Sequence, residues 1–138
     1  MDQRRQEQPS RATDTFWIDA EDPPAPPATR RSGKWLLFMP RDQIDEAWAT
    51  VARAVVEGRL GGRAKVSTAR PNPNASRRDR HVICVYTRDS KDEADVMRVR
   101  EELRRLGFIA TIPYKTDEAT LAGRYAVRGD RRISKYQC

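Results

Sequence analysis

The stretch His-Val-Ile-Cys-Val-Tyr-Thr at residues 81–87 is the strongest strand signal in the chain. It is short, apolar and rich in β-branched residues, which pack well on a pleated surface. A second apolar run, Lys-Trp-Leu-Leu-Phe-Met at residues 34–39, is closed by Pro40 and also predicts a buried strand. The fold is therefore expected to contain a β-sheet that includes both segments.

Two segments with helical periodicity lie between and after these strands. In the first, apolar residues recur at positions 44, 48, 51 and 55, so one stripe would face the core. Asp42 can cap the start of this helix, and Gly58 suits the position after its end. In the second, Ser90 can cap the start, apolar residues recur at positions 96, 99, 103 and 106, and Gly107 ends the helix.

The remaining strand signals are weaker. Further strands are expected at residues 63–69 and 108–112, with strand-like pieces near 121–127 and 132–136. Alternation along the first of these places Arg63, Lys65 and Ser67 on one face. A polar loop joins it to residues 81–87, which favours antiparallel pairing. The order predicts an α+β fold, in which two amphipathic helices pack on one face of a mixed, mostly antiparallel sheet and the other face is open.

The domain organisation is predicted from a change in composition. Residues 1–33 are rich in Gln, Arg, Asp, Ser and Thr and contain four prolines between positions 23 and 27, which predicts a disordered tail. Residues 34–138 are expected to form a single α+β domain. Phe16, Trp17 and Ile18 form an apolar island in the tail. This island either packs back on the domain or anchors a partner.

The positive charge belongs to the predicted domain. The formal net charge is +7, and residues 1–33 hold five Arg against six Asp and Glu, which leaves about +8 on residues 34–138. Such a domain favours anionic partners: nucleic acid, a nucleotide, a phosphopeptide or an acidic surface. The alternative is that the charges only keep the surface solvated.

Several classes of protein are not indicated by the sequence. We find no phosphate-binding glycine loop, zinc-protease helix, Cys-x-x-Cys pair or nucleophile elbow. Cys84 and Cys138 are not spaced as metal ligands, and the single histidine, His81, cannot complete a zinc site, so no metal or cofactor is expected. No apolar stretch reaches the ~18 residues of a membrane span, and no signal-peptide run is present. A cytoplasmic protein is the expectation.

Cations and tyrosines on the predicted strands are the remaining candidates for chemistry. Lys65 lies among small residues, where loss of hydration would let it act as a base, although it can equally extend from a sheet edge into water. His81 can transfer a proton near neutral pH or serve a structural role. The other candidates are Tyr86, Tyr114, Lys115, Arg124, Tyr125 and Arg128; an Arg among them suits phosphate because its fork donates two parallel hydrogen bonds.

Several ungapped blocks resemble the basophilic-leukaemia-expressed protein family, over about residues 32–126. The blocks are SGKWL (32–36), AW (47–48), AVVEGRL (54–60), AKVS (64–67), VICVYT (82–87) and YKTD (114–117), with Gly123 and Tyr125. That family is similar in fold to the cap-binding translation initiation factor 4E, which implies a curved antiparallel sheet backed by helices. Cap binding of that type uses two Trp rings. Here Trp35 and Trp48 are expected in the core, and Trp17 in the tail.

The segments Lys65–Ser67, Val82–Tyr86 and Gly123–Tyr125 resemble a second family, the phosphothreonine lyases, including the lyase domains of lanthipeptide synthetases. These enzymes eliminate phosphate from a phosphopeptide with a Lys base and a His acid. The resemblance implies Lys65 as the base and Tyr86 as a group that orients the substrate. Where those enzymes have the acid this chain has Leu36, so His81 would supply the proton from another strand. The phosphate-binding residues implied are Lys34, Lys115, Arg124, Tyr125 and Arg128.

Three functional hypotheses follow. The first is a phosphothreonine or phosphoserine lyase-like domain, which binds a phosphorylated peptide and eliminates phosphate. The alternative is a non-catalytic module with the initiation factor 4E-like fold, which binds RNA, a nucleotide or a phosphoprotein by charge. The third is a protein-interaction module that uses the Phe16–Ile18 island of the tail. The sequence leaves the oligomeric state open.

Overall fold

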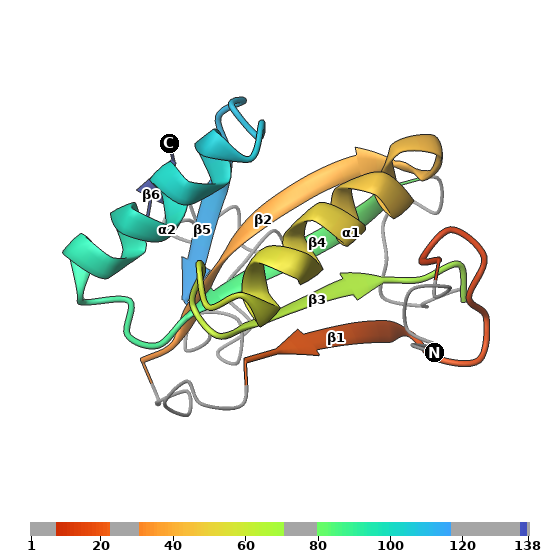
Figure 1. The fold of residues 1–138 in the computed structure, drawn as a ribbon, viewed down its shortest axis with the longest axis horizontal. Helices are drawn as coiled ribbons and strands as arrows, with labels where there is room; N and C mark the ends of the chain where they lie inside the picture. The colour runs from red at the N-terminus through yellow and green to blue at the C-terminus, as the bar shows by residue number, and fades with distance from the viewer. Residues whose placement is uncertain (1–7, 23–30, 71–79, 117–135, 138) are drawn as a thin grey trace, which may run out of the picture.

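The computed structural model describes residues 8–22, 31–70, 80–116 and 136–137. These residues form two helices and a six-stranded sheet (Figure 1). The elements in chain order are β1 (Trp17–Glu21), β2 (Gly33–Pro40), α1 (Arg41–Val56), β3 (Arg63–Ser67), β4 (Arg80–Thr87), α2 (Glu93–Arg105), β5 (Pro113–Thr116) and β6 (Tyr136–Gln137).

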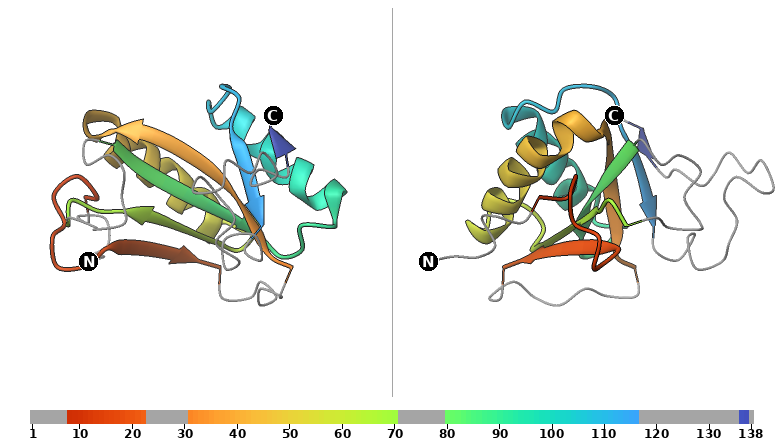
Figure 2. Two further views of the ribbon diagram at one scale, coloured as in Figure 1. Left: turned by 180° about the vertical axis from the view of Figure 1, so that it is seen from behind. Right: turned by 90° about the vertical axis from the view of Figure 1, so that its right-hand side faces the viewer.

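The sheet has the strand order β1-β3-β4-β2-β5-β6, and every neighbouring pair is antiparallel. The longest pairing joins β2 and β4 over eight residues, from Gly33 opposite Thr87 to Pro40 opposite Arg80. Both helices cover the same face of the curved sheet (Figure 2). The predicted fold class is confirmed: a mostly antiparallel sheet carries two helices on one face.

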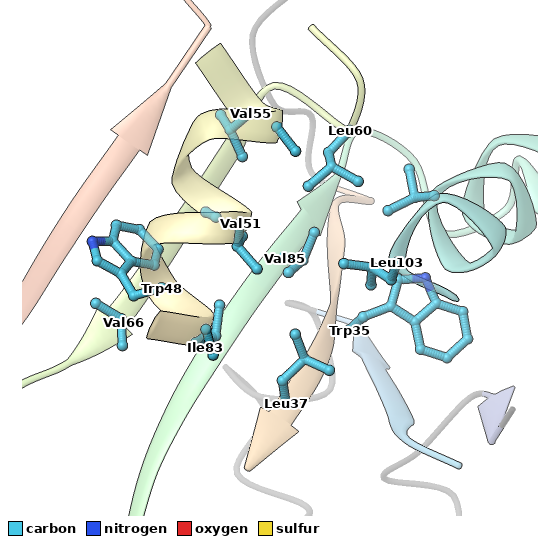
Figure 3. Packing of buried hydrophobic residues seen from close by; sticks show 14 of the residues in the cluster. Trp35, Leu37, Trp48, Val51, Val55, Leu60, Val66, Ile83, Val85 and Leu103 are labelled. Carbon is cyan, nitrogen blue, oxygen red and sulfur yellow. The ribbon is translucent and has the colours of Figure 1, made fainter. Parts of the chain in front are cut away.

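The hydrophobic core lies between the helices and this face (Figure 3). Strand alternation decides which residues enter it, because successive side chains point to opposite faces. On β4, for example, Ile83 and Val85 are fully buried against the helices, whereas Cys84 and Tyr86 point to the other face. The labelled core residues are Trp35, Leu37, Trp48, Val51, Val55, Leu60, Val66, Ile83, Val85 and Leu103.

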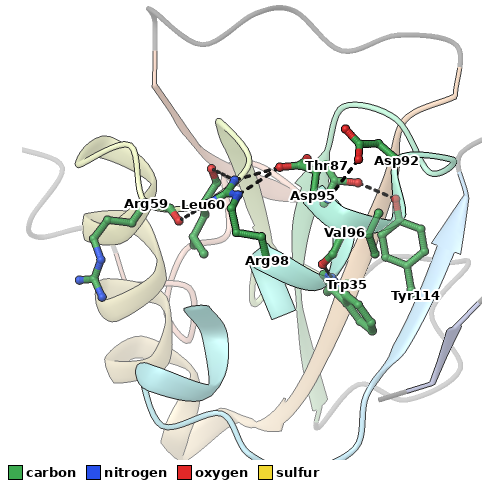
Figure 4. A network of polar contacts seen from close by, with 9 residues as sticks. All are labelled: Trp35, Arg59, Leu60, Thr87, Asp92, Asp95, Val96, Arg98 and Tyr114. Atoms are coloured by element: carbon green, nitrogen blue, oxygen red, sulfur yellow. Dashed lines mark hydrogen bonds and ion pairs between the residues drawn. The ribbon is translucent and has the colours of Figure 1, made fainter. Parts of the chain in front are cut away.

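Trp35 of β2 contacts both α2 and β5 in the core. Its indole Nε1 donates a hydrogen bond of 3.0 Å to the carbonyl oxygen of Val96 in α2, and its ring meets the Tyr114 ring edge-on at 5.1 Å. The Tyr114 and Thr87 hydroxyls are hydrogen-bonded at 2.5 Å (Figure 4). Position 33 must be glycine here, because a Cβ atom at Gly33 would lie 2.3 Å from the Tyr114 hydroxyl oxygen.

Polar side chains of α2 connect this helix to the segment between α1 and β3 (Figure 4). Arg98 donates to the carbonyl oxygens of Arg59 and Leu60, at 3.2 and 3.3 Å, and pairs with Asp95. The helix is capped by Asp92, whose carboxylate accepts from the backbone N–H of Asp95, so the predicted Ser90 cap is wrong. Neither helix among the described residues is long and apolar enough to cross a bilayer.

The prediction of a disordered tail over residues 1–33 is wrong for Trp17–Glu21, which form β1. This strand pairs with β3 along its whole length, and Ile18 is buried in the core. Upstream, the backbone N–H and hydroxyl of Ser10 both donate to the Asp45 carboxylate on α1, at 2.9 and 2.5 Å. Of the two alternatives for the apolar island, the structure shows that it packs back on the domain.

The strand predicted at residues 108–112 is also misplaced, because β5 begins at Pro113. Arg100 of α2 is fully buried, and its guanidinium donates to the carbonyl oxygens of Phe108 and Ala110, at 2.8 and 2.7 Å. These carbonyls therefore bond to α2 and do not pair with a neighbouring strand. Proline is tolerated as the first residue of a strand, so Pro113 opens β5. At α1 the N-cap is Pro40, and Asp42 lies in the first turn without capping the helix.

We expect Arg100→Met to destabilise the protein by about 2–4 kcal/mol, because the fully buried Arg100 side chain would lose two charge-assisted hydrogen bonds to carbonyl oxygens. Urea unfolding at neutral pH measures this change. The matched control is Arg105→Met at the end of the same helix, where the side chain is 76% exposed. That variant should stay within about 0.5 kcal/mol of the parent. Equal losses of stability in both variants would contradict the role given to Arg100.

Candidate functional site

The face of the sheet that points away from the helices carries a cluster of cations. By strand alternation Arg63 and Lys65 of β3 point to this face, as the sequence predicted for their strand. The register places Lys34 of β2 opposite both Tyr86 of β4 and Lys115 of β5. Four cations from three strands therefore share one surface, which we call the cationic face.

Two aromatic rings lie among these cations. The Arg63 guanidinium carbon lies 4.8 Å from the centroid of the Tyr86 ring, and Lys34 Nζ lies 5.8 Å from it. On the neighbouring strand Lys65 Nζ lies 4.0 Å from the Trp17 ring. Cations at these distances are attracted by the electron-rich faces of the rings. Each ring is therefore held in place by at least one cation of the cluster.

An apolar floor lies beneath the cations. Leu36, Cys84 and Tyr86 form a second, smaller hydrophobic cluster, and Trp17 and Val82 pack against it. The floor follows from the register, because Cys84 lies opposite both Leu36 and Lys65. Leu36 therefore fills this floor, at the position where the lyases would have their acid.

Lys115 has the one shifted pKa that is resolved among the described residues. Burial lowers the pKa of Lys115 below its ordinary value of 10.5, and the charge of the neighbouring Lys34 lowers it further. Cys84 acts in the opposite direction. The ammonium groups of Lys34 and Lys115 therefore repel each other on the cationic face. An anion bound beside this pair would relieve the repulsion between the two ammonium groups.

The structure brings together four of the predicted site residues: Lys34, Lys65, Tyr86 and Lys115. Three others, Arg124, Tyr125 and Arg128, lie outside the described residues. Trp17 and Arg63 also lie in the site, although the sequence did not predict them as site residues. The alternation of Trp-Ile-Asp-Ala-Glu at residues 17–21 was the available signal for Trp17, because period two marks a half-buried strand.

His81 lies on the opposite side of the sheet from Lys65. It shares the helix-facing side of β4 with Ile83 and Val85, and only 2% of its surface is exposed. Its Nδ1 lies 2.9 Å from the carbonyl oxygen of Ser67, which can only accept, so Nδ1 carries the hydrogen. Nε2 is buried without a partner. The base and acid implied by the lyase resemblance are therefore separated by the sheet.

The tryptophans exclude a clamp of two stacked Trp rings. The chain has three Trp residues. Trp35 is fully buried and Trp48 is 5% exposed, both in the core as the sequence predicted. Only Trp17 reaches the cationic face. In the part of the chain that the structure describes, no group of His, Cys, Asp or Glu side chains is arranged to hold a metal ion.

The sequence pattern of the family described as Basophilic leukemia-expressed protein Bles03 matches residues 25–121. The chain belongs to the Bles03 family. The match spans β2 to β5 and so includes Lys34, Lys65, Tyr86 and Lys115 of the cationic face. The resemblance found in the sequence is therefore confirmed.

Solved structures of translation initiation factor 4E share the fold. Ascaris suum eIF4E-3 with an m2,2,7G cap matches with a TM-score of 0.55 and 17% identity, over 78% of this chain and 57% of the other. Schistosome eIF4E with m7GpppA and 4E-BP gives 0.55 and 18%, over 78% and 59%. C. elegans eIF4E-3 with the 4E-binding protein Mextli gives 0.53 and 16%, over 65% and 55%. This Bles03-family chain thus spans less than two thirds of each.

We expect Lys115→Met to raise the free energy of unfolding at neutral pH. The folded state of the parent holds this ammonium at a cost, because its pKa is lowered from 10.5 by burial and by Lys34. As pH rises through the folded pKa towards 10.5, the folded state loses the proton first and the cost disappears. The advantage of the variant should therefore shrink with rising pH.

Chemical unfolding of both proteins between neutral pH and pH about 10 measures this difference. Lys91→Met is the matched control, because Lys91 is exposed in the turn before α2. If the free energy of unfolding depends on pH in the same way for both variants, the ammonium of Lys115 does not destabilise the folded protein.

Proposed function

We propose that this chain is a non-catalytic module that binds a nucleotide or a short single-stranded stretch of RNA on its cationic face. The observation that carries the proposal is the gathering of Lys34, Arg63, Lys65 and Lys115 around two aromatic rings on one side of the sheet. Phosphates need cations, and bases need flat rings on which to stack. This face offers both within one surface.

Lys65 and Trp17 form the part of the face best suited to a nucleotide. Lys65 and the Trp17 ring are both half-buried, with Lys65 Nζ at 4.0 Å from the ring centroid. A base stacked on Trp17 would bring its phosphate within reach of the same ammonium. Tyr86 contributes differently, because it is only 8% exposed and its ring lies near two cations. Its role would be to position Arg63 and Lys34.

The similarity to initiation factor 4E supports a nucleotide ligand, since two of the matching structures hold cap nucleotides. The mode of binding must differ from a sandwich between two Trp rings, because Trp35 and Trp48 are in the core. One accessible Trp favours stacking on a single side. Charge and one aromatic ring would then supply the affinity, without a preference for a methylated base.

A lyase has less support. Elimination of phosphate needs a base and an acid on the same substrate, and Lys65 and His81 lie on opposite sides of the sheet. General acid or base help is worth on the order of 10²–10⁴ in rate. Binding of a phosphopeptide without turnover would need the cations alone. The Trp17 ring would then take no part in binding.

We expect Lys65→Gln to weaken binding of a fluorescently labelled single-stranded RNA several-fold, measured by anisotropy. The dependence of log K on log salt should become shallower by about 0.7, which is the contribution of one phosphate contact to a single strand. Lys91→Gln, an exposed lysine outside the cationic face, is the matched control and should leave both values unchanged. The same loss in both variants would indicate non-specific charge and reject the site.

Trp17→Ala distinguishes the ligand classes in the same titration. Loss of a stacked base costs about 1–3 kcal/mol, so RNA binding should weaken whereas binding of a phosphothreonine peptide should not. If the peptide binds more tightly than the RNA and ignores the Trp17 substitution, the ligand is a phosphoprotein.

We expect phosphothreonine and phosphoserine peptides to keep their mass when incubated with the protein, because His81, the acid that the lyase resemblance implies, lies on the other side of the sheet from Lys65. Mass spectrometry of the peptides beside a Lys65→Ala sample measures this. Loss of phosphoric acid that depends on Lys65 would establish lyase activity and overturn the non-catalytic proposal.

A further inference from the structure

The outer edge of β1 has backbone groups that pair with nothing else in the described residues. β1 lies at one end of the sheet, beside β3 (Figure 1). The N–H of Thr68 donates to the carbonyl of Phe16, and the N–H of Asp22 donates to the carbonyl of Gly62. Because bonding alternates along an antiparallel pair, Ile18 and Ala20 also bond inward to β3. The N–H and C=O groups between them therefore point outward.

Trp17 is protected at this edge, and the next two outward residues are not. The Thr15 hydroxyl donates to the Trp17 carbonyl at 3.0 Å and also accepts from the Trp17 N–H. No hydrogen bond among the described residues reaches the outward groups of Asp19 or Glu21. A short unpaired edge of this kind is a template for another strand.

The side chains of the same two residues are acidic in a basic protein, and they lie opposite Lys65 and Arg63 of β3. Residues 12–29 contain four acidic residues and no Lys or Arg, in a chain of net charge +7. Asp19 and Glu21 are both exposed. Asp19 pairs with Arg63 at 3.3 Å, but both side chains are nearly half exposed, so this ion pair contributes little and can exchange.

These carboxylates also disfavour the pairing of β1 with β1 of a second copy. In the fully overlapping antiparallel register, β1 of a second copy would set Asp19 opposite Asp19, and a shift of two residues would set Asp19 opposite Glu21. Like charges directly opposite each other destabilise a strand pair. The edge is therefore poorly suited to self-association, although it is suited to a strand of opposite charge.

We propose that β1 accepts an extended, basic segment of another protein, which adds a strand to the sheet with Lys or Arg opposite Asp19 and Glu21. This mode draws affinity from main-chain hydrogen bonds and specificity from alternate side chains. The residue between the two cations would point to the helix side, beside half-buried Ala20, where a small apolar side chain fits. The recognised pattern is basic-apolar-basic. The proposal requires no ligand on the cationic face, although Asp19 pairs with Arg63 of that face.

The probe is the peptide Lys-Val-Lys-Val-Lys, with Glu-Val-Glu-Val-Glu as its opposite-charge counterpart. Amide hydrogen exchange followed by NMR gives a readout at each residue. Binding of the basic peptide should slow exchange at Asp19 and Glu21, whose N–H groups point outward. The amides of Ile18 and Ala20, already bonded to β3, are the internal reference. Unchanged exchange at Asp19 and Glu21, or equal binding of the acidic peptide, would overturn the proposal.

Two substitutions at position 21 separate backbone pairing from charge. Glu21→Gln removes the charge alone, whereas Glu21→Pro also removes the outward N–H and leaves every bond to β3 intact. We expect several-fold weaker peptide binding for Glu21→Gln and a further several-fold loss for Glu21→Pro. Glu46→Gln, on the exposed side of α1, should bind as the parent does. Equal affinities for Glu21→Gln and Glu21→Pro would reject strand addition.

Two further measurements keep the test decisive if Glu21→Pro does not fold. A peptide methylated on the backbone nitrogens that face β1 should lose binding to the parent protein, because it cannot donate to Asp19 or Glu21. Retained binding would overturn the proposal. Sedimentation at rising protein concentration tests the other occupant: a dimer that Glu21→Gln strengthens would show that a second copy takes this edge.

Discussion

The eight-residue register between β2 and β4 determines both faces of the sheet. It turns Trp35 and Val85 towards the helices and Lys34 and Tyr86 away from them. A slip of one residue would exchange the two sets, burying charge in the core and exposing the largest apolar side chains. The bond from Trp35 to the carbonyl of Val96 opposes such a slip, since a slip would turn the indole away from α2. The cationic face thus depends on the packing of the core behind it.

The parts of the fold that the sequence predicts are those whose pattern is local. The strands near 34–39 and 81–87 and both helices are visible because periodicity alone marks them. The sequence did not predict β1, because its five alternating residues lie among polar residues and before four prolines. The composition of this segment therefore favoured a disordered tail over a strand. β5 was predicted too early in the chain because the carbonyl oxygens of Phe108 and Ala110 accept hydrogen bonds from Arg100, a contact that strand periodicity does not report.

The candidate site was predictable to the same extent. Alternation places Arg63 and Lys65 on one face without any structure. Their neighbours depend on which strands pair and in what register, so the closeness of Lys34 to Lys115 and of Lys65 to Trp17 could not be read from spacing. The position of His81 on the side opposite Lys65 likewise depends on how β3 and β4 pair. Residue types indicated phosphate chemistry, and only the arrangement of the strands separates a binding surface from a pair of catalytic groups.

The place of β1 in the sheet has a consequence for how the chain assembles. Among the strands that the structure describes β1 comes first in the chain, and its partners on β3 lie more than forty residues later. Closing so long a loop costs entropy, which the pairing of β1 with β3 must offset. β1 therefore stays unpaired until β3 has been made. Until it docks, the side of β3 that it covers is open, and the newly made chain is most exposed to misassembly at that edge.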